Sequence, residues 1–339
     1  MREGWEYKKL GEIINVRTGK LDANASSEDG QYPFFTCSRE PLRISSYSYD
    51  CECVLVAGNG DLNVKYYNGK FDAYQRTYII TLKEGITKTS VPFLYKFFTS
   101  YIEVLRQRSI GGIIKYIKLG DITNAILPLP PLSMQETIVS ELDKINELIR
   151  LKKEQLKDYD NLAQSIFYEM FGDPVVNEKG WEVKKFSEVA SFKNGLNFGK
   201  NENGYSYKIL GVGDFKNNYV VNSSLLEYIN LNDELSSDYF LKPEDIVFVR
   251  SNGSKELVGR CVSVDCTEPT TYSGFCIRCR LDENSGVLPM YLLYVCKNKG
   301  IREYLTQSGR GCNISNVNQK ILNSTDIIIP PVSKQELFI

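Results

Sequence analysis

The sequence predicts an α+β fold in which two similar, strand-rich domains are joined by one long helix. Three observations predict it: a set of sequence features occurs twice in the same order, short β-branched and aromatic segments dominate each copy, and a charged segment without proline separates the copies. The chain has 339 residues, of which 42% are apolar, and this is enough for two domains with packed cores.

The repeat extends over most of the chain. "GWEYKKLGEIINVRTGK" at 4–20 is matched by "GWEVKKFSEVASFKNGL" at 180–196, and "PPLSMQE" at 130–136 by "PPVSKQE" at 330–336. Between them, "CECVLVAGNG" at 51–60 resembles "EDIVFVRSNG" at 244–253, "VPFLYKFF" at 91–98 resembles "LPMYLLYV" at 288–295, and "SIGGIIKYI" at 109–117 corresponds to "SGRGCNISNV" at 308–317. The period is too long for a solenoid, so we predict a duplicated domain, with copies at 1–132 and 173–332.

Each copy is predicted to contain short strands and one helix. "CVLVAG", "TYIITL", "DIVFVR" and "GFCIRCRL" have strand composition, and apolar residues at helical spacing follow Pro92 and Pro289. "AGNGD" and "RSNGS" are predicted hairpin turns. A strand over "GFCIRCRL" points Cys276 and Cys279 to opposite faces, which favours separate thiols over a zinc site.

The segment 133–172 is predicted to form a long helix with a coiled-coil seam. Its apolar residues are spaced alternately by four and three, with only Lys152 interrupting, and about 38 helical residues would extend roughly 57 Å. Gly172 and Pro174 mark its end. The seam consists of Ile138, Leu142, Ile145, Ile149, Leu156, Tyr159, Ala163, Ile166 and Met170.

The repeated phrase is interpreted as a capping box that starts a helix. Ser133 would cap the first free amides, with Glu136 reaching back to the serine amide, and Ser333 with Glu336 would do the same in the second copy. The second helix would then occupy only 333–339.

Composition lowers the expectation of hydrolytic chemistry. The chain contains no histidine, which removes the commonest general base, and it shows no glycine-rich phosphate loop and no "N-P-P-[FY]" methyltransferase motif. The formal net charge is −1, with 41 basic and 42 acidic residues, so any basic surface must come from clustering. Nine scattered cysteines, no apolar run of membrane length and a start without a signal-peptide core favour a cytoplasmic protein with reduced thiols.

The paired Pro-Pro-x-Ser-x-Gln-Glu phrases, the "GW-x-x-K-K" domain openings and the heptad helix between the copies resemble the specificity subunit of type I restriction-modification enzymes, from Gly4 to Ile339. The resemblance implies two target recognition domains, each reading one part of a split double-stranded DNA site, and two antiparallel helices that hold them apart. It also implies methyltransferase subunits that bind S-adenosylmethionine and methylate adenine, and a restriction subunit for cleavage. The chain itself would be non-catalytic and without a cofactor.

The sequence departs from this pattern because most of the second helix is lacking. We therefore expect the apolar seam of helix 134–171 to recruit the same helix of a second copy, giving a homodimer, unless methyltransferase covers it first.

Candidate DNA contacts are polar and basic residues in the predicted loops. Arginine and asparagine read guanine and adenine through paired hydrogen bonds, whereas lysine mostly contacts phosphate. The candidates in the first copy are Lys20, Asn59, Lys65, Arg76, Arg108, Lys115 and Lys118, and those in the second copy are Lys200, Arg250, Asn252, Lys255, Arg310, Asn313 and Asn316.

Three other functions stay open on the sequence alone. The two halves could form a shared active site, for which Asp61, Asp121 and Asp214 are candidate carboxylates. The chain could be a protein-interaction scaffold that does not bind DNA, built around the long helix. It could also be the specificity subunit of a type II-like methyltransferase system.

Overall fold

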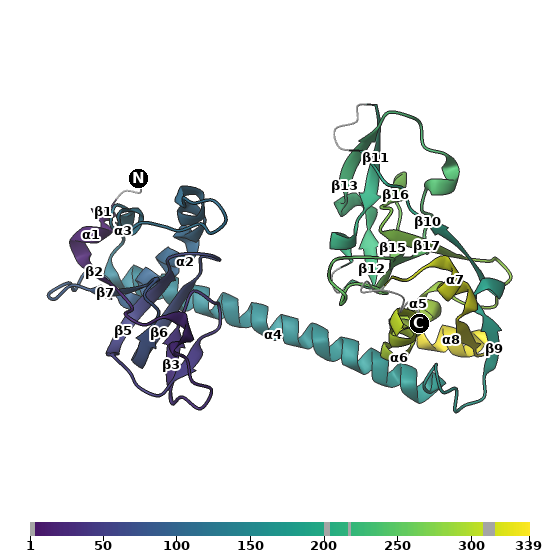
Figure 1. Ribbon diagram of the computed structural model, residues 1–339, viewed down its shortest axis with the longest axis horizontal. Helices are drawn as coiled ribbons and strands as arrows, with labels where there is room; N and C mark the ends of the chain where they lie inside the picture. Colours follow the sequence, from purple (N-terminus) through teal and green to yellow (C-terminus); the bar gives the residue numbers. More distant parts are fainter. Residues whose placement is uncertain (1–3, 200–203, 216–217, 308–315) are drawn as a thin grey trace. The chain divides into compact units, whose positions relative to one another are not determined.

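The computed structural model describes residues 4–199, 204–215, 218–307 and 316–339. The chain divides into two compact units, Met1–Glu154 (unit 1) and Gln155–Ile339 (unit 2) (Figure 1). Both units combine small sheets with helices, so the fold is α+β as predicted.

Unit 1 is built around a six-stranded sheet with strand order β2-β7-β5-β6-β3-β4, accompanied by a two-stranded sheet of β1 and β8. Its elements are β1 Glu6–Lys9, α1 Leu10–Ile13, β2 Ile14–Thr18, β3 Tyr32–Phe35, β4 Leu42–Ile44, β5 Tyr49–Ala57, β6 Val64–Ala73, β7 Thr77–Leu82, α2 Val91–Arg108, α3 Leu119–Thr123 and β8 Ile126–Leu129, with a 3₁₀ turn at Ala23–Ala25.

The central strand β5 is buried on both faces. Val54 and Val56 belong to the core cluster that includes Phe98 of α2, whereas Cys53 and Leu55 belong to a second cluster on the opposite face. This alternation follows from the two-residue period of a strand, and it explains why "CVLVA" is an unbroken apolar run.

Unit 2 contains a five-stranded sheet with strand order β10-β17-β14-β15-β12, a two-stranded sheet of β9 and β18, and a further three-stranded sheet, β13-β11-β16. Its strands are β9 Glu182–Lys185, β10 Ala190–Asn194, β11 Tyr205–Leu210, β12 Val220–Asn222, β13 Glu227–Leu231, β14 Ile246–Val249, β15 Cys261–Asp265, β16 Thr270–Tyr272, β17 Cys276–Leu281 and β18 Asp326–Ile329. Its helices are α5 Pro289–Lys297, α6 Lys299–Gln307, α7 Gln319–Ser324 and α8 Val332–Phe338, with 3₁₀ turns at Phe186–Glu188, Val212–Asp214, Ser223–Leu225 and Ser237–Tyr239.

The two units repeat one topology. In both, the first four strands of the main sheet pair antiparallel and the next pair is parallel: β2-β7-β5-β6-β3 corresponds to β10-β17-β14-β15-β12. The two-stranded sheets β1-β8 and β9-β18 also correspond, and both are antiparallel. This agreement matches the repeated sequence, and the β13-β11-β16 sheet is an addition that the sequence reading did not predict.

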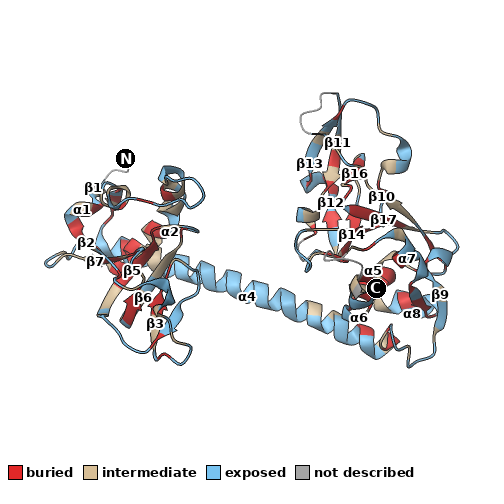
Figure 2. Ribbon diagram, viewed as in Figure 1, coloured by how far each residue is buried: buried red, intermediate tan, exposed pale blue. Residues whose placement is uncertain are grey.

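Helix α4, Leu132–Phe171, is continuous over 40 residues and is followed by Gly172, whose φ of 76° is the left-handed conformation predicted for that glycine. Ile138 packs against the core of unit 1, and Met170 packs against the core of unit 2. Between them the apolar seam is exposed: Leu142 is 39% exposed, Ile145 49% and Ile149 48%. Figure 2 shows the middle of the helix as a continuous exposed segment.

The predicted capping box is wrong. α4 begins at Leu132, so Ser133 lies inside the helix rather than at its cap, and its side chain and that of Glu136 are exposed. In the second copy Pro331 occupies the cap position of α8 and makes no side-chain cap hydrogen bond. The two prolines restrict the backbone before each helix, and the buried polar contacts at this turn are made by Gln135 and Gln335.

The cysteines of "GFCIRCRL" lie as the strand pattern predicts. Cys276 belongs to one core cluster of unit 2 and Cys279 to the cluster on the other face of β17. Burial raises the pKa of the Cys276 thiol to about 12, so it is a core thiol. No helix in the described part of the chain has the length and apolar character needed to cross a membrane.

Candidate nucleic-acid interface

Five loops of unit 1 come together at one site through backbone hydrogen bonds and side-chain contacts. The Gly19 and Gln75 amides donate to Thr77 O (3.1 Å) and Leu21 O (2.9 Å), which joins 19–22 to the 74–77 turn. The Gly58 amide donates to Arg76 O at 2.8 Å and so adds the β5–β6 loop. Loop 109–117 joins the same group because the Gly60 amide donates to the carbonyl oxygen of Lys115 at 2.9 Å.

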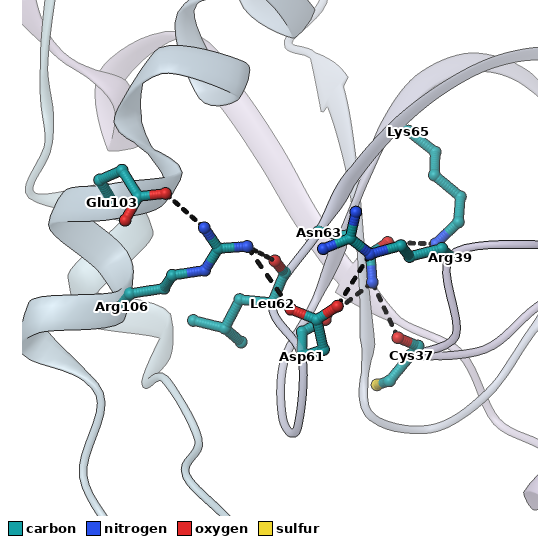
Figure 3. Close-up of polar contacts among 8 residues, drawn as sticks. All are labelled: Cys37, Arg39, Asp61, Leu62, Asn63, Lys65, Glu103 and Arg106. Carbon is teal, nitrogen blue, oxygen red and sulfur yellow. Dashed lines mark hydrogen bonds and ion pairs between the residues drawn. The ribbon is translucent and has the colours of Figure 1, made fainter. Parts of the chain in front are cut away.

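A polar network ties the β5–β6 loop to the fifth loop, 36–40, and to helix α2 (Figure 3). The Asp61 carboxylate accepts from Arg39 Nε at 2.9 Å and from Arg106 Nη2 at 3.5 Å, and Arg106 Nη2 also donates to Leu62 O at 2.8 Å. Asn63 Nδ2 donates to Cys37 O at 2.8 Å.

The charged groups of this network affect the position of the loops more than the unfolding free energy of the unit. The hydrogen bond from Arg39 holds the pKa of the Asp61 carboxyl below its usual value. Asp61 and Arg39 are both more than half exposed, and exposed ion pairs of this kind contribute little to unfolding free energy. Their contribution to the unfolding free energy is therefore expected to be small, and their main effect is expected on loop position.

Most first-copy candidates lie on or beside this loop cluster. Lys20, Asn59, Arg76 and Lys115 are in the joined loops, and Arg108 and Lys118 flank the 109–117 segment. Lys20, Arg76, Arg108, Lys115 and Lys118 are exposed. Lys65 differs, because its ammonium group hydrogen bonds to Asn63 Oδ1 and burial lowers its pKa. Lys65 thus supports the β5–β6 loop through Asn63 and is less available to a ligand than predicted.

Two isoleucines at the tip of the 109–117 loop were missed by sequence reasoning. Ile113 is fully exposed, at 105%, and Ile114 is 62% exposed. The loop base is held by reciprocal hydrogen bonds between Ile110 and Tyr116, at 3.0 and 2.8 Å, so the apolar tip is presented on a fixed base. The available signal was "GGIIK", an apolar pair placed between glycines and a lysine.

Unit 2 repeats three backbone hydrogen bonds of unit 1 at corresponding positions. The Gly195 amide donates to Cys276 O at 3.0 Å, as Gly19 does to Thr77 O. The Arg250 amide donates to Phe275 O at 2.8 Å, as Gly58 does to Arg76 O, and the Val317 amide donates to Arg250 O at 2.9 Å, as Ile117 does to Gly58 O at 3.0 Å. The units therefore share a backbone framework that carries different side chains.

Gly19 and its counterpart Gly195 cannot be replaced by a residue with a side chain without displacing the backbone. A Cβ on Gly19 would lie 2.0 Å from Ala73 O, and a Cβ on Gly195 would lie 2.2 Å from Ser273 O, both inside van der Waals contact. The repeated glycines at the ends of the "GW" motifs therefore allow a loop to approach the neighbouring strand turn.

The second-copy candidates have varied surroundings. Among the described residues, the Arg250 guanidinium has no hydrogen-bond or ion-pair partner, and exposed Phe275 precedes β17 beside it. Asn252 Oδ1 accepts from the Ser254 amide at 2.8 Å and forms an Asx turn, while Lys255 is exposed. Asn316 is half-buried, and Lys200, Arg310 and Asn313 lie outside the described residues.

An arginine from the following helix holds the strand-connecting loop in each unit. Arg302 of α6 donates through Nε to Val258 O at 3.3 Å and through Nη2 to Glu256 O, as Arg106 Nη2 does to Leu62 O. Arg302 also lines a cavity of ≈ 270 Å³ together with Asp160 and Lys297. Burial lowers the pKa of Lys297, whose Nζ donates to Asn218 O at 2.7 Å. These cations support the loops from inside the unit.

Comparison with known proteins gives one consistent family. The profile described as "Type I restriction modification DNA specificity domain" matches residues 2–158 and 178–338. The EcoDI type I restriction enzyme specificity subunit of Escherichia coli is 43% identical over 45% of this chain and 34% of its own length. The StySPI specificity subunit of Salmonella potsdam is 24% identical over 69% of this chain and 53% of its own length.

The fold is also similar to solved structures. The S subunit of a type I restriction-modification system from M. genitalium superposes with a TM-score of 0.57 at 15% identity, covering 98% of this chain and 87% of that one. A chain from a structure of type I system assembly and conformational transition gives 0.50 at 18% identity, covering 99% and 89%. The chain spans between about a third and a half of the two curated relatives above.

Proposed function

Because the chain belongs to the type I restriction-modification DNA specificity family, we propose that each of its units reads one part of a split double-stranded DNA site. The main observation in favour is the shared backbone framework with exchanged side chains. Gly58 and Arg76 of unit 1 correspond to Arg250 and Phe275 of unit 2. Because the two units share this backbone framework, we expect them to approach DNA in the same way. Their different side chains would select different bases, so the DNA site is expected to be asymmetric.

The loop clusters offer the residue types that base recognition needs. Arg76 and Arg250 are suited to paired hydrogen bonds with guanine, and Lys20 and Lys115 to phosphate. Ile113 and Ile114 could contact a thymine methyl group or insert between stacked base pairs. Both side chains are exposed, so burying them against DNA would be favourable. With a net charge of −1, the isolated chain gains little from counterion release and should bind DNA weakly.

Catalysis is assigned to other chains of the complex. We propose that methyltransferase subunits bind S-adenosylmethionine, flip the target adenine and dock on α4, and that a restriction subunit joins them for cleavage. At about 1.5 Å per residue, α4 is roughly 60 Å long. That length suits a spacer between half-sites about one DNA turn, roughly 34–36 Å, apart.

The exposed middle of the α4 seam supports a second proposal, which is association of two copies of the chain through this helix. Its apolar residues follow heptad spacing, and its two ends are already packed into the unit cores. An antiparallel pair related by a twofold axis would place Leu142–Ile149 of one copy against Leu156–Ala163 of the other, so the same surface serves both partners.

A domain exchange tests the assignment of one unit to each half-site. Residues 4–129 are replaced by the first domain of another family member, and the modified sequence is determined with the methyltransferase present. The proposal predicts that one half of the site changes while the other half stays the same. A change in both halves would refute it.

A further inference from the structure

We propose that Gln135 and Gln335 are positioning residues that lock each helix of the repeated phrase to its own domain. Gln135 would thereby set the direction in which α4 leaves unit 1. The inference deepens the proposed function, on which it rests, because that direction would determine which gap between half-sites the protein accepts. It also gives the doubled "PP-x-S-x-QE" phrase a physical role that capping does not provide.

Gln135 is fully buried, and its amide joins three segments of unit 1. Nε2 donates to Pro130 O, just after β8, at 2.8 Å and to Lys88 O, in the loop before α2, at 2.7 Å. Oε1 accepts from the Thr89 hydroxyl at 2.9 Å. Both donors of the amide are thus used, together with its acceptor.

Gln335 makes the same arrangement in unit 2 and is also fully buried. Its Nε2 donates to Pro330 O at 2.8 Å and to Gly286 O, in the loop before α5, at 2.9 Å. Its Oε1 accepts from the Leu288 amide at 2.8 Å. The same contacts therefore recur in two places, 200 positions apart, although the residues around them differ.

The chemistry of the site requires an amide. A carboxylate in place of Gln135 would face two carbonyl oxygens with no proton to donate, and an apolar side chain would leave both carbonyls buried and unpaired. The neighbouring Glu136 and Ser133 are exposed, so the buried polar contacts at this turn belong to the glutamine. Because Ser90 caps α2 directly after Thr89, the amide couples the starts of α2 and α4.

A small change in the angle at which α4 leaves unit 1 would cause a large displacement of the far end of the helix. A tilt of about 5° over a helix of roughly 60 Å moves its end by roughly 5 Å. That displacement exceeds the rise of one base pair, about 3.4 Å. A loosened joint would therefore admit gaps one base pair shorter or longer without changing the bases that each unit reads.

The test measures gap preference in the assembled complex of this chain with its methyltransferase. Duplexes carry the wild-type half-sites at the native gap or at a gap one base pair shorter or longer. Gln135→Met should reduce the preference for the native gap by roughly tenfold or more, since angstrom-scale misplacement has effects of that size. The sequence of each half-site should stay unchanged, and the matched control Glu136→Gln should behave as wild type.

Thr89→Val removes one of the three contacts with little change of volume, and it decides the question if Gln135→Met does not fold. An assembled variant that discriminates between gaps as strongly as wild type would overturn the inference, as would altered base identity inside a half-site. If the wild-type complex modified no split site, the proposed function itself would fail, so the two failures are distinguishable.

Discussion

Replacing Ile145 and Ile149 with lysine should abolish association of two copies through α4. Each side chain is about half exposed in the single chain, at 49% and 48%, so about half of its surface remains to be buried. Full burial of an isoleucine contributes about 1.5–3 kcal/mol, and half of that is about 1 kcal/mol. Four such positions in a dimer give roughly 4 kcal/mol, or about a 1000-fold increase in Kd. Burying the new charges would weaken association further.

Light scattering coupled to gel filtration measures this effect directly on the isolated chain. The matched control places two lysines on the opposite face of α4, as Leu151→Lys with Asn161→Lys, and should leave the dimer intact. Circular dichroism should show equal helix content in all three proteins. A monomeric wild type at tens of micromolar, or a dimer that survives the seam substitutions, would refute the packing argument.

Three further variants test the loop clusters. Arg250→Ala should weaken cognate DNA binding by the assembled complex by about 1–3 kcal/mol and relax one half-site, and unchanged affinity and motif would remove Arg250 from the contacts. Ile113→Ser with Ile114→Ser should lower cognate affinity without altering its salt dependence, because no phosphate contact is lost; a changed salt slope would contradict this. Because Arg39 lowers the pKa of Asp61, stabilisation by that carboxylate is present above the ordinary carboxyl pKa and lost on acidification. The difference in unfolding free energy between wild type and Asp61→Asn should therefore shrink in acid, and a difference that grows would contradict it.

Periodic features of the structure were predictable from the sequence. The heptad spacing of α4 and the glycine at its end predict a long helix whose bounds lie within two residues of the observed Leu132–Phe171. Alternation within β17 predicts the opposite faces of Cys276 and Cys279, and repeated phrases predict the repeated topology. In each case the signal lies within neighbouring residues, whose relative directions are fixed by backbone geometry.

Features that depend on distant partners were not predictable. Ser133 and Glu136 have capping-box spacing, yet the buried contacts of Gln135 reach Lys88 and Thr89, 47 and 46 positions away. Their separation leaves no periodic trace in the sequence.

The loops show the same limit. The Arg39–Asp61–Arg106 network joins three separate segments, and the burial that lowers the pKa of Lys65 arises from the folded chain rather than from its neighbours in the sequence. The sequence identified the loops that carry the candidate site, whereas the tertiary contacts determine which side chains are available.

The most direct test of the central claim is methylome sequencing of cells that express this chain with its methyltransferase, compared with cells that lack the chain. Two units with one framework and different loop residues predict a single asymmetric motif made of two short specific parts, separated by unspecified bases of constant number, with methylated adenine. A continuous motif, a palindrome, or methylation that does not depend on the chain would contradict the account.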